Sequence, residues 1–396
     1  MSALVRWLSR GCILALLLSF AGASDILHAA DADSAPVASA GTASTPAQHV
    51  IYITIDGMRY QELFSGGDAK LMQSDTGGVY NPEALRARFA NDDPIKRRER
   101  LMPFFWSVIA EQGQVFGSPD DNCEAVVKNG KYFTYPGYQE LLCGFPDDAI
   151  DSNDKKPNAN KSVLEWLNEK PELKGKVAAF TSWDLFPYIL HAARSGIYVN
   201  SGWQEFDFIQ DEATRSQLNR TMRELPHLWE YARFDYFTIA GAMEYLRAKE
   251  PNVLYISLDE TDDWCHAGRY DLYLDAANRT DGFIKTLWEF VQNSPTYRGT
   301  TSLVVTTDHG RGDGREGWKN HGVDLPGSHR VWSAVMGPKV LALGVRKDLT
   351  VTQGQGAATV ALLLGYDYAA SDPRIAPPLP GILSTTDGAT ESPIPE

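Results

Sequence analysis

The chain has 396 residues, of which 43% are hydrophobic, 22% charged and 11% aromatic. This composition excludes a disordered or fibrous protein and is sufficient for a large buried core. Lysine and arginine number 37 against 51 for aspartate and glutamate, and the formal net charge of -14 argues against a general nucleic-acid binder.

The N-terminus has the pattern of an export signal. Arg6 and Arg10 lie at the start of an apolar run over residues 12–20, and residues 21–23, Ala-Gly-Ala, form a small-residue cleavage site. The run is too short to span a bilayer, and no later stretch is long and apolar enough to do so. We therefore predict an exported protein, periplasmic or secreted, with no membrane span after signal cleavage.

Composition divides the rest of the chain into a linker, a folded domain and a tail. The segment after the signal and the last segment are both rich in small residues and proline without periodicity, so we expect both to be flexible. The predicted parts are a signal peptide, a disordered linker, a folded domain and a flexible tail, over residues 1–23, 24–48, 49–375 and 376–396. A charged stretch within residues 66–101 is a candidate cap insertion.

Short β-branched runs alternate with helical patterns in the folded part, which predicts an α/β fold with a largely parallel central sheet and helices on both faces. The expected strands are Val50–Ile55, Val177–Ser182, Val253–Leu258, Ser302–Thr307 and Val331–Met336. The expected helices are Pro103–Gln112, Tyr236–Lys249, Leu272–Asn293 and Thr352–Leu364. Ligands of such sheets lie beyond the carboxyl ends of the strands.

Three of these strands are followed by carboxylates or imidazoles. Asp56 follows the first strand, Asp308 and His309 follow the strand at Ser302–Thr307, and an acidic run over residues 259–263 follows the strand at Val253–Leu258. The carboxyl ends of parallel strands meet at one edge of the sheet, so these side chains are expected to lie together.

Two further histidine positions extend this set. Asp262 and His266 are four residues apart and share a face on one helical turn, with Asp263 and Asp259 as competing ligands. A later histidine is available at His321 or at His329. Carboxylates and imidazoles without thiolates suit two divalent ions, with zinc expected before manganese.

Thr134 is the candidate nucleophile. The run from Tyr132 to Gly144 reads as a strand end turning into a short helix, with Pro136 at the first helical position and Gly144 past the end. The free N–H groups and dipole of a helix N-terminus favour an anion there. The alternative is that Thr134 is only the N-cap of that helix.

Cys123 and Cys143 are candidates for a disulfide.

In their order along the chain, these motifs resemble the alkaline phosphatase superfamily, nearest its type I phosphodiesterase and nucleotide pyrophosphatase branch. The resemblance covers about residues 50 to 364. It is carried by Ile55-Asp56-Gly57, Thr134-Tyr135-Pro136, Glu260-Thr261-Asp262 with His266, Thr307-Asp308-His309-Gly310, His321-Gly322 and Gly337-Pro338.

The resemblance implies two metal sites and a covalent intermediate. One ion would be held by Asp56, Asp308 and His309 and would also bind the Thr134 oxygen; the other would be held by Asp262, His266 and His321. Thr134 would attack phosphorus in line and form a phospho-threonine that water hydrolyses. His321 is preferred over His329 because a His-Gly pair at that distance from Gly337-Pro338 resembles the branch.

The chain departs from the branch at Gly137, where the branch carries an asparagine, and only eleven residues separate His309 from His321. Arg311, Arg315 and Lys319 lie in that short loop, and one of them, with Arg311 as the candidate, is expected to contact substrate oxygens. The alternative is a surface loop whose cations pair with Asp313 and Glu316. We predict an exported two-metal hydrolase of small phosphoric esters that favours diesters. The alternatives are a monoesterase, a sulfatase-like hydrolase of the same superfamily, or a non-catalytic exported metal-binding module; the sequence leaves the oligomeric state open.

Overall fold

The computed structural model describes residues 47–384. The predicted signal peptide and all but the last two residues of the predicted linker lie outside this range. Among the described residues, no helix combines the length and the apolar character needed to cross a bilayer.

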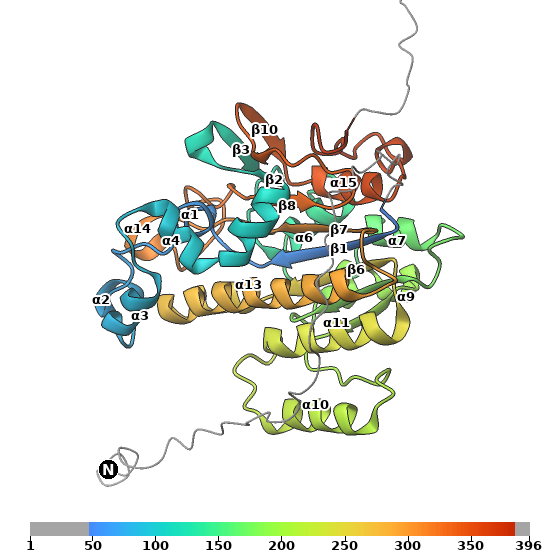
Figure 1. Ribbon diagram of the computed structural model, residues 1–396, viewed down its shortest axis with the longest axis horizontal. Helices are drawn as coiled ribbons and strands as arrows, with labels where there is room; N and C mark the ends of the chain where they lie inside the picture. The colour runs from blue at the N-terminus through green and yellow to red at the C-terminus, as the bar shows by residue number, and fades with distance from the viewer. Residues whose placement is uncertain (1–46, 385–396) are drawn as a thin grey trace, which may run out of the picture. The chain divides into compact units, whose positions relative to one another are not determined.

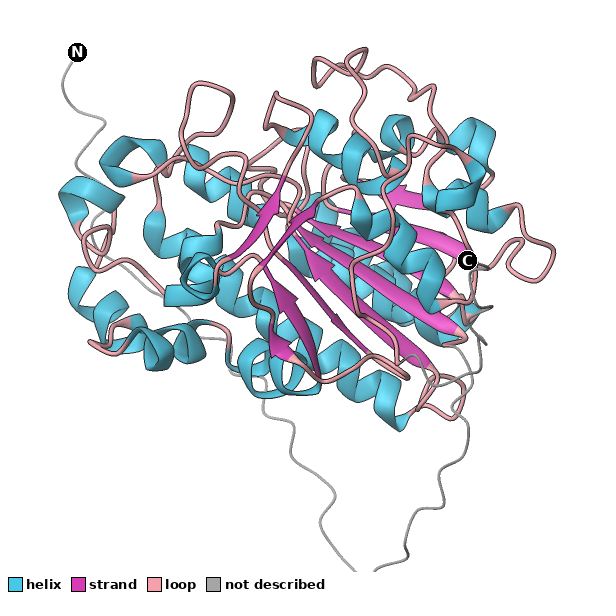
Figure 2. Cartoon of the chain, turned by 90° about the horizontal axis from the view of Figure 1, so that it is seen from above, coloured by secondary structure: helices cyan, strands magenta, loops and turns pink. Residues whose placement is uncertain are grey.

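An eight-stranded central sheet forms the middle layer (Figure 2). In spatial order its strands are β5 (Tyr198–Ser201), β4 (Val177–Thr181), β6 (Val253–Leu258), β1 (His49–Ile55), β7 (Thr301–Thr306), β8 (Ser333–Met336), β2 (Gly113–Phe116) and β9 (Gly344–Val345). Neighbouring strands are parallel except that β8 runs antiparallel to β7 and β2. A separate parallel pair joins β3 (Cys123–Val126) and β10 (Leu349–Thr352). The expected fold class, mixed α/β with a largely parallel sheet, is confirmed.

Alternate residues of the central strands face two separate hydrophobic cores. Ile51 and Ile53 of β1 lie in one core, whereas Val50 and Tyr52 lie in the other. This alternation explains why the strand sequence is apolar throughout, since helices cover both faces of the sheet. The core on the first face is completed by α1 (Tyr60–Ser65), α3 (Pro82–Phe89), α4 (Pro94–Leu101), the π-helix η1 (Phe105–Ile109), α11 (Asp235–Lys249) and α13 (Tyr270–Asn293).

The second face carries α6 (Thr134–Cys143), α7 (Val163–Asn168), α8 (Phe186–Ile189) and α15 (Gln355–Leu363). Figure 1 shows α13 and α11 running alongside the sheet, with α10 beyond α11. The remaining helices are short, except for α10, and lie in the connections: α2 (Ser74–Gly77), α5 (Ala110–Gln112), η2 (Pro119–Asp121), α9 (Ala192–Ser195), α10 (Glu212–Glu224), α12 (Glu260–His266), α14 (Gly314–Gly317) and η3 (Ala369–Ser371).

One helix differs from expectation in type, and one segment differs in order. The helix expected over Pro103–Gln112 is present, but its central part, η1, is π-helical and leads directly into α5; the Asp281 carboxylate accepts the backbone N–H groups of Phe104 and Phe105 at the start of η1, both at 2.8 Å. Residues 376–384, expected in the flexible tail, pack onto the domain: Ile382 is buried and its carbonyl accepts the N–H of Leu341.

The three cysteines of the described part are free thiols and all are buried. Cys123, on β3, and Cys143, the last residue of α6, therefore form no disulfide in this structure. Burial raises the pKa of the Cys123 thiol, which makes it a poor nucleophile.

Candidate active site

The register of the central strands brings the predicted ligands to one edge of the sheet. Ile55 of β1 pairs with Leu258 of β6, and Thr54 pairs with Thr306 of β7, so the three strands end side by side. The next residues along the chain are Asp56, Asp259 and, one further on, Asp308. Because β1 is central, its neighbours on both sides place their end residues around Asp56.

The first group of side chains contains Asp56, Asp308 and His309, all fully or almost fully buried. The Nε2 atom of His309 lies 3.4 Å from Asp56 Oδ1 and 3.5 Å from Asp308 Oδ2. The other carboxylate oxygens are occupied: Tyr138 donates its hydroxyl to Asp56 Oδ2, and the Gly57 N–H donates to Asp308 Oδ1, both at 3.0 Å. Asp56 Oδ1 and Asp308 Oδ2 are buried without a hydrogen-bond partner.

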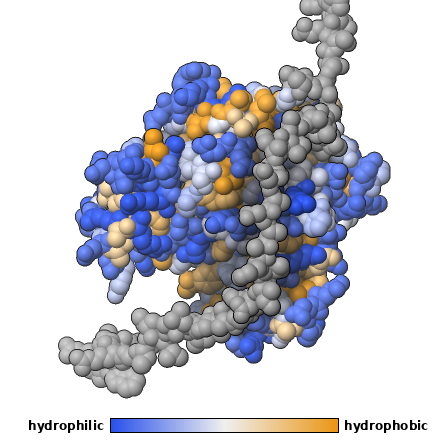
Figure 3. Space-filling model, in the orientation of Figure 1, coloured by the Kyte–Doolittle hydropathy of each residue, from blue (hydrophilic) through white to orange (hydrophobic). Residues whose placement is uncertain are grey.

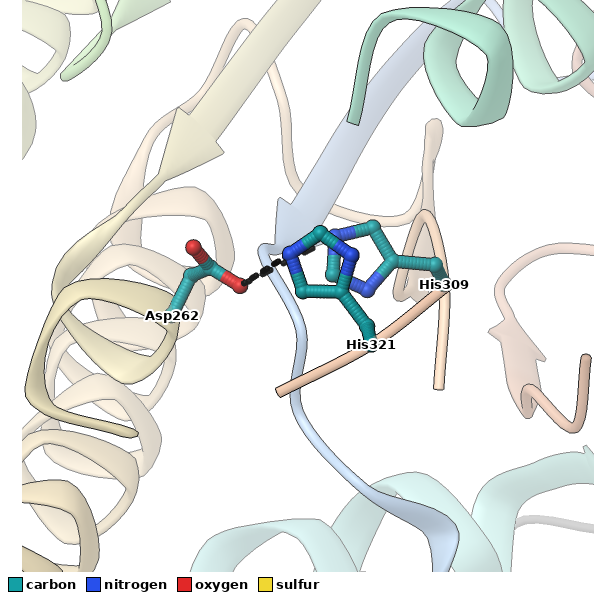
Figure 4. A group of neighbouring side chains, drawn as sticks. All are labelled: Asp262, His309 and His321. Carbon is teal, nitrogen blue, oxygen red and sulfur yellow. Dashed lines mark ion pairs between the residues drawn. The ribbon is translucent and has the colours of Figure 1, made fainter. Parts of the chain in front are cut away.

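The second group lies beside the first and is built on α12. Asp262 and His266 are one helical turn apart, and Asp262 Oδ2 lies 3.2 Å from His266 Nε2. His266 Nε2 is in turn 3.1 Å from His321 Nε2. Figure 4 shows Asp262 directed at the rings of His309 and His321, whose Nε2 atoms each lie 3.8 Å from Asp262 Oδ1. The structure thus brings all six predicted ligand side chains together.

Backbone carbonyls fix the orientation of two of the imidazoles. The Nδ1 atom of His309 lies 3.0 Å from the carbonyl oxygen of Gly310, and Nδ1 of His321 lies 3.2 Å from that of Tyr132. If each Nδ1 carries the proton, each Nε2 is left with its lone pair directed at the carboxylates. Hydrogen bonding of this kind sets the tautomer of metal-ligating histidines.

The electrostatics of the cluster suit cations. Burial and then the neighbouring Asp308 and Asp262 carboxylates raise the pKa of Asp56 well above its usual range, and burial raises the pKa of Asp308 to about 8. Burial and then His321 lower the pKa of His309, which favours the neutral imidazole that ligates metals. A divalent ion would satisfy the unpartnered oxygens of Asp56 and Asp308 and offset the repulsion between carboxylates.

Among residues 47–384, two overlapping groups of side chains could each hold a metal ion. Asp56, Asp308 and His309 form one; Asp262, His309 and His321 form the other, with the ligand atoms of each within 4.8 Å of one another. His309 belongs to both. Both sets consist of carboxylates and imidazoles, the donor types expected from the sequence.

Thr134 lies next to this cluster at the start of α6. Its Oγ1 atom is 3.5 Å from His309 Nε2, and its side chain lines the adjoining pocket. The sequence analysis expected Pro136 at the first helical position, but α6 begins two residues earlier at Thr134, with Phe133 as N-cap. No side-chain cap hydrogen bond is made there, so Thr134 is the first helical residue of α6 and its hydroxyl is not used as a cap.

Gly137 is the residue that lets α6 approach the backbone at Asp308. A Cβ atom at this position would lie 2.6 Å from the carbonyl oxygen of Asp308, a separation that real Cβ atoms essentially never show. The same carbonyl accepts a hydrogen bond of 2.6 Å from the Gln353 side-chain amide. The glycine that departs from the branch pattern therefore allows a close contact between the helix bearing Thr134 and the strand end bearing Asp308.

Arg311 does not line the pocket. Its side chain is fully buried, and each guanidinium nitrogen donates to a protein acceptor. These acceptors are the Asp262 carboxylate and the carbonyl oxygens of Gly57, Asp262 and Lys319. The expected contact with substrate oxygens is therefore not available to this side chain, because all three guanidinium nitrogens are used by Asp262 and by backbone carbonyl oxygens.

The pocket beside the cluster has a volume of about 360 Å³. Besides Thr134 and the second ligand group, it is lined by Asn153, Lys155, Trp183, Asp184, Leu185, Tyr231, Asp259 and Asp263. Asn153 is the notable addition, since its side-chain oxygen accepts the N–H of Tyr135 at the start of α6 at 3.0 Å. It lies in an irregular segment 19 residues after Thr134, and no periodicity marks it in the sequence.

Other candidates lie away from this pocket. The ring of His329 is tilted against that of Tyr132, with centroids 5.8 Å apart, and His329 belongs to neither group of candidate ligands. The segment 66–101 packs against α1 and α13, for example through an ion pair of 2.6 Å between Arg88 and Asp275, and contributes no residue to the pocket lining.

Comparisons with known proteins show similarity in fold. No protein-family model matches the chain, and no curated protein sequence matches it. Among solved structures, it is similar to the wild-type alkaline phosphatase PafA, with a TM-score of 0.54, 10% identity, and coverage of 87% of this chain and 100% of that one. It is also similar to the phosphonate monoester hydrolase of Agrobacterium radiobacter, with a TM-score of 0.50, 13% identity, and coverage of 81% and 74%. The chain therefore has an alkaline-phosphatase-like fold.

Proposed function

We propose that the chain is an exported, metal-dependent hydrolase of phosphoric esters that favours diesters and uses Thr134 as its nucleophile. The observation that carries this proposal is the position of the Thr134 hydroxyl, 3.5 Å from His309 Nε2 at the edge of a pocket that also contains Asp262, His266 and His321. The fold shared with two phosphoester or phosphonoester hydrolases supports the same chemistry.

The residues present fit two divalent ions, and zinc is the ion that their donor types favour. Asp56, Asp308 and His309 would hold one ion, and Asp262, His266 and His321 would hold the other. When bound, such ions lower the pKa of a coordinated hydroxyl or water and neutralise charge on the phosphoryl oxygens. Arg311 keeps the Asp262 carboxylate in place and lowers its pKa against the opposing effect of burial.

In the proposed reaction the Thr134 oxygen attacks phosphorus, a P–O bond to one ester group breaks, and an alcohol leaves. Water then cleaves the phospho-threonine and restores the hydroxyl. Asn153 lies beside Thr134, and its side-chain oxygen already accepts the Tyr135 N–H. Its amide nitrogen is therefore the group available to donate to a phosphoryl oxygen.

The preference for diesters is supported by the charge of the pocket lining. Lys155 is the one lysine or arginine that lines it, and its Nζ lies 2.6 Å from Asp184 Oδ2. Arg311 is buried and fully used by protein acceptors. A monoester dianion needs more positive charge on its transferred group than a diester does, and no uncommitted cationic side chain of the lining supplies it.

The test is a comparison of three p-nitrophenyl substrates on metal-loaded protein: methyl p-nitrophenyl phosphate, p-nitrophenyl phosphate and p-nitrophenyl sulfate. We expect kcat/KM to be highest for the diester and lowest for the sulfate. Thr134→Ala is the control for background hydrolysis. Fastest turnover of the sulfate, or no turnover of either phosphate ester, would overturn the proposal.

A further inference from the structure

An exposed apolar segment lies between α10 and α11. Eight large hydrophobic side chains of the described residues are exposed; three of them lie in this segment and a fourth lies in the first turn of α11. They are Leu225 (41% exposed), Leu228 (56%), Tyr231 (46%) and Tyr236 (56%). Figure 3 shows hydrophobic residues in the region that Figure 1 assigns to α11. Such clustering is unusual for a surface that contacts only water.

This segment is fixed to the helix that carries the second ligand group. Tyr231 lines the pocket and donates its hydroxyl to Asp263 Oδ1 at 2.8 Å. The ring of Trp229 packs edge-on against that of Trp264 on α12, with centroids 4.8 Å apart. Trp203 donates its indole N–H to the Trp229 carbonyl oxygen at 2.9 Å. Tyr231, which is 46% exposed, therefore belongs both to the exposed segment and to the lining of the candidate active site.

We infer that this surface, residues 225–231, binds an apolar ester group of the substrate, so that the preferred substrates are phosphodiesters carrying an alkyl or aryl chain. The inference rests on the proposed function. Water-exposed leucine and tyrosine side chains gain free energy when a hydrocarbon chain covers them. A second anionic group on the substrate would instead meet the carboxylates of Asp184 and Asp263 on the pocket wall.

The charges around the segment favour a single amphiphilic molecule over an anionic membrane surface. The arginines of α10, the neighbouring helix, are all in ion pairs with glutamates: Arg215 with Glu212, Arg220 with Glu224 and Arg223 with Glu205. Attraction to anionic lipid needs uncommitted basic side chains near the surface. The described part of α10 offers none.

The experiment measures kcat/KM for methyl, butyl and octyl p-nitrophenyl phosphodiesters below their micelle concentrations. The leaving group is constant, so the chain length reports binding of the second ester group. Burial of one methylene group strengthens binding about fourfold. Partial burial of an octyl chain should therefore raise kcat/KM at least roughly tenfold over that of the methyl ester. Leu228→Ser should reduce the octyl-to-methyl ratio by roughly threefold or more. Leu343→Ser is the matched control, because Leu343 is 50% exposed next to β9 at the other edge of the sheet.

The inference is overturned if kcat/KM of the wild type does not rise with chain length, or if Leu228→Ser leaves the octyl-to-methyl ratio of kcat/KM unchanged. Either result leaves phosphodiester hydrolysis intact. Absence of turnover with every ester instead overturns the proposed function. In that event calorimetry with methyl octylphosphonate and methyl methylphosphonate decides the inference. The octyl compound is expected to bind roughly tenfold more tightly and to lose that advantage in Leu228→Ser; equal affinities would overturn it.

Discussion

The contact between α6 and the Asp308 loop can be tested by adding one methyl group. In Gly137→Ala the new Cβ would lie 2.6 Å from the Asp308 carbonyl oxygen, about 0.8 Å short of ordinary van der Waals contact. Either α6 or the loop must move, and both carry candidate site residues. Misplacement of a reacting group on this scale lowers kcat by roughly 10- to 100-fold. Overpacking costs about 1–3 kcal/mol, but alanine regains about 1 kcal/mol of helix propensity, so the net loss of stability should be about 0–2 kcal/mol.

The assay compares kcat for methyl p-nitrophenyl phosphate and the free energy of unfolding in wild type, Gly137→Ala and Gly282→Ala. Gly282 is an exposed residue of α13, and a Cβ there would meet nothing within 4 Å. Gly282→Ala should therefore gain about 0.5–1 kcal/mol of stability and keep its kcat. Wild-type kcat in Gly137→Ala would refute the idea that this close approach positions Thr134.

Thr134→Ala should abolish turnover while the protein still binds its metals, because the nucleophile is lost but the carboxylate and imidazole ligands remain; metal analysis with kinetics measures both, and retained activity would exclude Thr134. The wild-type protein should contain about two divalent ions, mainly zinc, and lose activity with a chelator, and His321→Ala should lower the metal content whereas His329→Ala should not; the opposite pattern would transfer the ligand role to His329. Glu140, whose carboxylate accepts the N–H groups of Lys128 and Asn129, has a pKa raised to about 7 mainly by burial. The folded protein thus holds this proton more tightly than the unfolded chain, so its contribution to stability, of order 3 kcal/mol, is lost as pH rises from about 4.5 through about 7. The free energy of unfolding, measured with denaturant at pH 5 and pH 8, should differ less between the two pH values in Glu140→Gln than in wild type. An equal difference in both proteins would contradict the raised pKa of Glu140.

The sequence by itself determined the fold class and the edge of the sheet where the site lies. Val50–Ile55 and Val253–Leu258 are apolar throughout, which is the mark of strands buried on both faces, and the structure has strands at both places. The acids and histidines that follow these strands had to meet at one sheet edge because parallel strands end together. The spacing of Asp262 and His266 similarly required a helical turn, which α12 provides.

Only the tertiary structure decided which groups face the pocket. Arg311 was expected there because it lies in the loop between His309 and His321. Side-chain direction depends on the path of that loop, however, and the Arg311 guanidinium donates to Asp262 instead. Asn153 and Tyr231 reach the pocket from segments without periodicity, where local sequence does not set direction. The role of Gly137 likewise depends on the Asp308 carbonyl, 171 residues away in the chain. The sequence does not show which backbone packs against Gly137, so it cannot show that a side chain at this position would clash.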